Sequence, residues 1–370
     1  MKKKSKDNKN YTFVFLYAIG SILIVAGHCY NGGINLFFDI FQPYAFHLGL
    51  FMFCSGYFYK SSNEDNFKEY FIKKFKRLII PMFIWNLIYG LFIQFIKLFG
   101  FSFGENFTLY NLIIAPLING HQFCFNLCFW FIPELFLIQM ITCLLRKGLS
   151  KFIKINEYLF FAFYLFLGIL GVYLSNKGFN KEWFLLLVRT LFFFPFFGMG
   201  ILYNRKIERY DKLSNIKYFS IVLLLQFIII FIEGKSPGFT VVWSKDFTNN
   251  LLLPFMVGFL GIAFWLRIAK ILEPITKDSG VINTISNYSL PIVAHQFFGF
   301  FILKFIFALF CRFTPFFNDF SISEFKSDFW YYYVPNNLGV FYFIYLIFGL
   351  VIPIIIAKIL EICKKKLKKS

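Results

Sequence analysis

Charged residues are scarce in this chain of 370 residues: Asp, Glu, Lys and Arg make up only 15% of it, against about a quarter in a typical soluble domain. No soluble domain, internal repeat or low-complexity linker is evident. Hydrophobic residues instead make up 58%, including 60 Phe, and the mean hydropathy is +0.65. The composition excludes a soluble enzyme and predicts an all-α protein that crosses the membrane many times.

The seven cysteines lack the spacing of a metal site. Cys124 and Cys128 lie beside an apolar run, and this pair alone does not indicate a disulfide. We interpret most of the cysteines as small apolar filler and expect no metal cofactor.

Apolar runs of about 20 residues, enough to cross roughly 30 Å of hydrocarbon, recur along the whole chain. They predict a single domain, residues 1–370, that forms a bundle of ten transmembrane helices. The expected helices lie at residues 11–30, 42–59, 78–99, 128–146, 158–175, 183–203, 216–233, 249–272, 284–310 and 338–363.

The cations alternate between the predicted loops. Lys and Arg gather in the N-terminal segment, in residues 60–77, 146–154, 205–217 and 267–277, and in the C-terminal tail. Because cytoplasmic segments carry the excess of Lys and Arg, this alternation supports ten helices with both termini in the cytoplasm. The net charge of +19 then reflects this bias and contact with anionic membrane lipids, and it does not indicate nucleic-acid binding.

Several ionisable side chains fall inside predicted helices, between the midplane and the outer surface. Such groups are costly in hydrocarbon and usually mark a site, so we expect an outward-facing polar cavity roofed by residues 100–127 and 311–337. Pro291, one turn before His295, is expected to open its helix. These side chains are His28, His47, Glu134, Arg189 and His295.

Plainer interpretations of these residues stay open. Each histidine could be a core residue bonded to a neighbouring carbonyl group. Glu134 and Arg189 could form a purely structural ion pair.

A second group of residues precedes the predicted helix 78–99 on the cytoplasmic side. Lys74 and Arg77 are three residues apart, so on a helix they share a face that suits a phosphorylated ligand. The alternative is ordinary anchoring of a helix end by positive charge.

Five segments, taken in order, resemble the integral-membrane acyltransferase family three over nearly the whole chain: GHCY, FHLGLFMFCSGYFYK, KKFKRLIIPMFIW, FWFIPELF and ISNYSLPIVAH. Members of that family O-acylate, chiefly acetylate, cell-surface glycans and related acceptors in bacteria. The resemblance therefore implies a multi-pass protein of the bacterial cytoplasmic (inner) membrane. It also implies acyl-CoA, usually acetyl-CoA, as the donor substrate.

The resemblance also implies roles for matched residues. His28 matches the family's essential histidine of the first helix, and Lys74 with Arg77 matches the basic pair associated with acyl-CoA. The family usually has Arg or Lys eleven residues before that histidine; here the position is Tyr17, which can donate one hydrogen bond but carries no charge. The other matched positions, in the second-helix motif and the later motifs, are His47, Ser55, Gly56, Trp130 and His295.

Acyl transfer from a thioester to a hydroxyl group needs a base for the hydroxyl proton and donors for the oxyanion. We expect His28 to be the base, because an imidazole titrates near working pH, with Glu134 orienting it. Arg189, His47 or His295 would stabilise charge or position the acceptor.

Two other classes of function remain. A bundle of ten helices with a polar cavity, broken at Pro254 and Pro291, would also suit an exporter of surface polysaccharide or a small-solute transporter. A scaffold without a site fits less well, because it does not account for five ionisable groups within helices.

Overall fold

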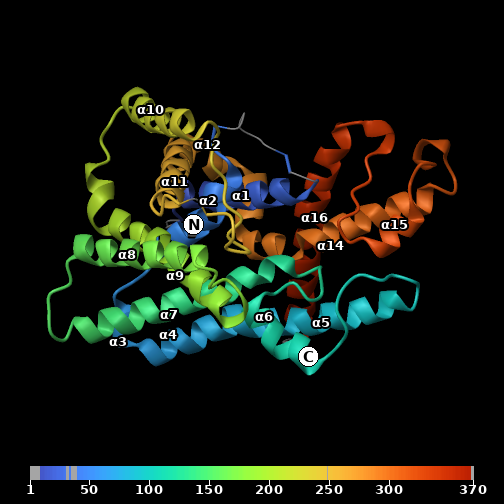
Figure 1. Cartoon of the computed structure of the whole chain (residues 1–370), viewed down its shortest axis with the longest axis horizontal. Coiled ribbons are helices and arrows are strands. Elements are labelled where there is room, and N and C mark those ends of the chain that lie inside the picture. The colour runs from blue at the N-terminus through green and yellow to red at the C-terminus, as the bar shows by residue number, and fades with distance from the viewer. Residues whose placement is uncertain (1–8, 31–32, 35–39, 248, 368–370) are drawn as a thin grey trace, which may run out of the picture.

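The computed structural model describes residues 9–30, 33–34, 40–247 and 249–367. The cations Lys2, Lys3, Lys4, Lys6, Lys368 and Lys369, which contributed to the predicted topology, lie outside this part of the chain. Every regular element in the described residues is helical (Figure 1), which confirms the predicted all-α fold.

Nine helical segments of the described chain are long and apolar enough to cross a membrane, which confirms a polytopic membrane protein. Each coincides with a predicted span. Their helices are α1 (Tyr11–His28), α4 (Phe67–Lys74) continued by α5 (Ile80–Lys97), α7 (Phe131–Leu149), α8 (Glu157–Asn176), α9 (Glu182–Leu202), α10 (Asn215–Glu233), α11 (Leu253–Ile271), α14 (Ser289–Phe310) and α16 (Val340–Leu367).

The tenth predicted span, residues 42–59, forms the shorter helix α2 (Pro43–Tyr57) of 15 residues. At 1.5 Å per residue it is about 22 Å long, less than the hydrocarbon thickness. It packs among α1, α9 and α11, so most of its surface meets protein. The side of the membrane on which the termini lie stays a prediction.

Three of the differences from the sequence prediction concern the basic pair and the two prolines that were expected to break helices. The helix expected at 78–99 begins at Phe67 and continues through a π-helical turn, Phe75–Ile79, so the basic pair lies within it. The predicted break at Pro254 is wrong: this proline stands in the first turn of α11, where its missing N–H is not needed. The helix expected at 284–310 is interrupted at Tyr288, three residues before Pro291.

Shorter helices fill the connections between these long helices. They are α3 (Ser62–Asp65), α6 (Ala115–Ile118), α12 (Glu273–Asp278), α13 (Gly280–Asn287) and α15 (Ile322–Ser327). Side-chain caps start several of the helices: Asn10 accepts the Phe13 N–H at α1, and Ser279 accepts the Ile282 N–H at α13.

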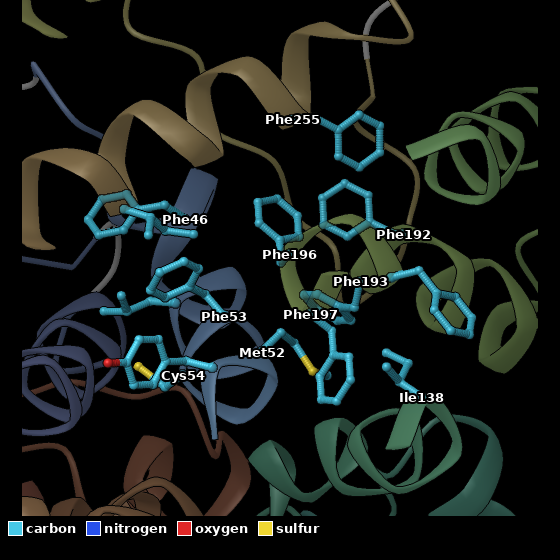
Figure 2. Packing of buried hydrophobic residues seen from close by; sticks show 14 of the residues in the cluster. Phe46, Met52, Phe53, Cys54, Ile138, Phe192, Phe193, Phe196, Phe197 and Phe255 are labelled. Carbon is cyan, nitrogen blue, oxygen red and sulfur yellow. The ribbon is translucent and has the colours of Figure 1, made fainter. Parts of the chain in front are cut away.

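The largest core cluster lies where α2 crosses α9 (Figure 2). Phe192, Phe196 and Phe255 pack there as tilted rings with centroids 5.3–6.0 Å apart. Glycines allow the two backbones to touch, because a Cβ on Gly56 would lie 2.0 Å from the Phe197 carbonyl oxygen, and one on Gly200 would lie 2.1 Å from that of Phe53. This crossing fixes the position of α2 within the bundle.

Arg146, buried at the end of α7, joins an ion-pair network at one end of the bundle. Its Nε donates to Glu64 at 2.9 Å, and its Nη2 donates to Glu157 at 2.8 Å. Arg205, beyond α9, donates to the same Glu157 at 2.6 Å. The network ties α3, α7, α8 and the end of α9 together.

Candidate functional site

Two cavities lie within the bundle. The His28 cavity has a volume of about 300 Å³ and a largely aromatic lining; the Lys74 cavity, of about 720 Å³, is more polar. Helices α1, α2, α7 and α14 contribute to both, so the same four helices connect the two cavities.

His28 is the last residue of α1, and its ring lines the smaller cavity. Its Nδ1 lies 2.7 Å from the Ile24 carbonyl oxygen. Because a carbonyl oxygen can only accept, Nδ1 carries the proton of the neutral ring and Nε2 is left with its lone pair. The hydroxyl of Tyr332 also donates to the His28 backbone carbonyl. The last turn of α1 therefore presents a fixed imidazole with an unprotonated nitrogen.

His47 lines the same cavity from α2. Its Nδ1 donates to the Pro43 carbonyl, so it takes the same tautomer as His28. Tyr44 lies between the two rings and makes edge contacts with both, at centroid distances of 6.1 Å to His28 and 5.3 Å to His47. The cavity thus offers two neutral histidines held by backbone carbonyls.

Gln296, on α14, is a polar neighbour of His28 that sequence analysis did not single out. Its side chain is within hydrogen-bonding contact of the His28 ring. Its Nε2 donates to the Cys128 sulfur at 3.1 Å and to the Val293 carbonyl at 3.2 Å, while its buried Oε1 accepts no hydrogen bond from the described residues. This oxygen is free to accept from a protonated His28.

His121, the fourth histidine, also lines the His28 cavity, although sequence analysis passed over it. Its ring stacks on Trp243 with centroids 4.5 Å apart. Burial, together with the nearby charge of Arg189, lowers its pKa to about 3, so the ring is neutral at physiological pH. His121 lies in the segment 100–127 that was expected to roof a cavity. That position is the feature of the sequence that could have identified it as a cavity residue.

Glu134 does not orient His28 as expected. Its Oε1 is 3.4 Å from Arg189 Nη1, and both side chains are fully buried. Arg189 also donates to the Val242 and Ile118 carbonyls, and its guanidinium lies 4.5 Å from the Trp130 ring. Neither Glu134 nor Arg189 lines the His28 cavity or the Lys74 cavity; the pair instead fixes the wall that carries Trp130 and Trp243. Among the described contacts, the group that orients His28 is the Ile24 carbonyl.

His295 likewise lies away from both cavities. The hydroxyl of Tyr89 and the His295 Nδ1 are 2.8 Å apart, and the Trp85 ring lies 4.2 Å from the imidazole. The structure therefore places His295 among core aromatic residues, while its neighbour Gln296 reaches His28.

The Lys74 cavity brings together the residues that the resemblance associates with the donor. Lys74 and Arg77 both line it, and the Lys74 ammonium lies 5.5 Å from the Tyr70 ring centroid. Tyr17 and Ser55 line it as well, and their side chains form a hydrogen bond. The cavity thus combines two cationic groups with hydroxyl groups placed deeper in the bundle.

The predicted site residues therefore separate into three groups. His28, His47 and Trp130 line one cavity, and Tyr17, Ser55, Lys74 and Arg77 line the other. Glu134, Arg189 and His295 lie behind the walls. Residues 121 and 127 from the first outer segment and Trp330 from the second reach the His28 cavity, as the expected roof would.

No curated protein and no solved structure matches the chain. The family model of acyltransferase family 3, described as an acyltransferase domain, matches residues 15–358. This match includes both cavities and nearly the entire helical bundle. The chain therefore belongs to acyltransferase family 3 and is a multi-pass membrane acyltransferase.

Proposed function

We propose that the protein moves an acyl group, in the first instance acetyl, from cytoplasmic acyl-CoA to a hydroxyl group of an outward-facing acceptor. The acceptor is a cell-surface glycan or a lipid-linked sugar in the bacterial cytoplasmic membrane. The family membership supplies acyl transfer as the reaction class. The two cavities supply separate places for donor and acceptor.

The single observation that carries the proposal is the tautomer of His28. With Nδ1–H held by the Ile24 carbonyl, Nε2 can take the proton of an acceptor hydroxyl. The hydroxyl oxygen then bonds to the thioester carbonyl carbon, the C–S bond breaks, and the thiolate takes the proton back from His28 Nε2. The products are an ester and the free thiol of CoA.

The cationic groups of the Lys74 cavity and its predicted position on the cytoplasmic side both suit acyl-CoA as the donor. Lys74 and Arg77 offer cationic groups for the phosphates of CoA, whose pantetheine arm would extend past Tyr17 and Ser55. These cations lie in the predicted cytoplasmic region, where acyl-CoA is found.

The acceptor fits the His28 cavity by its aromatic lining. Trp130, Trp243 and Trp330 border the cavity, and such rings pack against the apolar faces of sugar rings while the histidines bind hydroxyl groups. Neutral His121 and His47 supply further hydrogen-bonding groups near the reacting atoms.

The test is acyl transfer by membranes that contain either the wild-type protein or the His28→Ala variant. We expect transfer from labelled acetyl-CoA to surface glycan to fall at least a hundredfold, because general-base catalysis contributes about 10²–10⁴ in rate. Cys29→Ala is the matched control: this neighbouring side chain is buried, bonds to the Ala26 carbonyl and lines neither cavity. Full activity of inserted His28→Ala protein would remove His28 from the mechanism.

Mass spectrometry of surface glycans separates this function from export. Cells that lack the protein should retain the polymer and lose an acyl mass. Loss of the polymer itself would favour an exporter. The two cavities, if they lie along one pathway through the bundle, would serve that function as well.

A further inference from the structure

Four side chains line both cavities and so form the partition between them: Ile24, Leu48, Phe131 and Val293. All four are apolar, and they come from α1, α2, α7 and α14 in turn. Three are nearly buried, with exposures of 2% for Ile24, 6% for Phe131 and 8% for Val293. The boundary between the two cavities is therefore apolar at each of the four helices.

Helices α1, α2 and α14 carry polar or aromatic cavity residues on both sides of the partition. On α1, Tyr17 faces the Lys74 cavity and His28 faces the other, with Ile24 between them on one helical face. Their separation along the axis is about 16 Å at 1.5 Å per residue. On α2, Ser55 lines the Lys74 cavity and His47 lines the other, while Leu48, next to His47 in the chain, lines both.

We infer that this apolar partition is the passage through which the acyl end of the donor reaches His28, and that its width selects the acyl group by chain length. The inference rests on the proposed function. The C–S bond of the thioester breaks and the C–O bond of the ester forms on the His28 side. The CoA thiol, which regains the proton from His28, withdraws to the Lys74 side.

The chemistry of the partition fits such a passage. An acyl group is neutral and apolar, so hydrocarbon walls admit it, whereas the phosphates of CoA are held back at Lys74 and Arg77. An apolar constriction also excludes water, which limits hydrolysis of the thioester and prevents ions from crossing. The His28 cavity of about 300 Å³ lies at the lower end of ligand-site volumes, so a short acyl group leaves room for part of the acceptor.

The test compares transfer from acetyl-, butyryl- and hexanoyl-CoA by purified enzyme in lipid vesicles. Val293→Ala removes two methyl groups from the partition, and we expect the ratio of butyryl to acetyl transfer to rise about tenfold, since one methylene in an apolar pocket changes specificity by 10–200-fold. Leu290→Ala is the matched control on α14: Leu290 lines only the Lys74 cavity, so the ratio should stay at the wild-type value. If Val293→Ala does not fold, Leu48→Ala serves the same purpose from α2.

The outcomes separate the inference from the function on which it rests. Wild-type transfer with an unchanged chain-length ratio in both widened variants would overturn the partition as a filter and leave the acyltransferase proposal intact. Absence of transfer from every acyl-CoA to any surface acceptor, with the wild-type protein folded, would overturn both. A widened variant that gains longer donors while Leu290→Ala does not would establish the passage.

Discussion

At the scale of single residues, Gln296 is the side chain whose contribution is easiest to isolate. Its Oε1 is buried without a hydrogen bond from the described residues and lies beside His28, so it is placed to accept from the imidazolium formed during transfer. We expect Gln296→Leu to lower kcat about 10- to 100-fold with little change in KM, because the interaction exists only when His28 is protonated.

Gln296→Glu is the companion variant, because its carboxylate also accepts a hydrogen bond. It should keep more activity than Gln296→Leu and move the pH at which kcat is half-maximal. Equal loss in both variants, with an unchanged pH profile, would show that Gln296 acts by packing alone.

His121 gives a pH-dependent prediction. Its pKa in the folded protein, about 3, lies below the value of about 6.5 in an unfolded chain, so the folded state binds fewer protons between these values. Its contribution to stability is complete above pH 6.5 and declines as the pH falls. The stability difference between wild type and His121→Gln should therefore shrink by about 1 kcal/mol from pH 6.5 to 5.5. Unfolding in detergent at the two pH values measures it, and a constant difference would contradict the burial of a neutral ring.

The Glu134–Arg189 pair permits a comparison of two variants. Arg189 holds Glu134, Val242 and Ile118 together, so Arg189→Met leaves a buried carboxylate and two carbonyl groups without their donor. We expect a loss of about 3–5 kcal/mol, seen as a lower Tm and a disordered His28 cavity. The double variant Glu134→Leu with Arg189→Met should recover part of the loss. A single variant as stable as wild type would show that the pair is not a structural anchor.

Residue types alone could predict part of this site. His28 and His47 were identifiable because an ionisable group in an apolar helix is unusual. Gln296 carries no charge and gave no such signal, although it follows His295 directly. The ion pair of Glu134 with Arg189 was one of the open interpretations, but the sequence could not decide in its favour, since α7 and α9 are brought together only by tertiary packing.

At the scale of elements, the crossing of α2 and α9 depends on two glycines. Gly56→Ala would bring a methyl group 2.0 Å from the Phe197 carbonyl oxygen, a contact that only movement of the backbone can relieve. We expect a lower Tm and, because α2 carries His47, Leu48 and Ser55, reduced transfer. Gly148→Ala on α7 is the control, because no atom lies within 4 Å of its added Cβ, and stability should be unchanged or slightly higher. Equal stability of Gly56→Ala and wild type would show that the two helices are free to separate.

The sequence predicted where helices lie better than where they stop. Apolar runs located the nine long helices of the described residues because their length follows from the thickness of the bilayer, and the alternating cations agreed because cytoplasmic loops carry the excess of Lys and Arg. The continuation of α4 through the basic segment was missed, since charged side chains at a membrane surface do not end a helix. The interruption at Tyr288 stands among the polar residues Ser286, Asn287 and Ser289, three residues before Pro291, where the helix was expected to open.

At the scale of the whole molecule, the two cavities should open to opposite sides of the membrane. Tyr30→Cys in the His28 cavity should react with an impermeant thiol reagent on intact cells, and Asn66→Cys in the Lys74 cavity only after permeabilisation. Both variants should be made in a protein in which Cys124, Cys311 and Cys363 are replaced, because these are the cysteines of the described residues that are not buried. Labelling of both positions from one side would contradict the predicted orientation.

The buried Arg146 network has a consequence for how the protein is made. Glu64 is synthesised 82 residues before its partner Arg146. Glu157 is synthesised 48 residues before its second partner, Arg205. Until the ribosome has delivered all four, the growing chain carries carboxylates or guanidinium groups that still lack a counterion present in the finished protein. A chain that ends before Arg146 therefore holds Glu64 without its cation, and it should be less stable than the full-length protein.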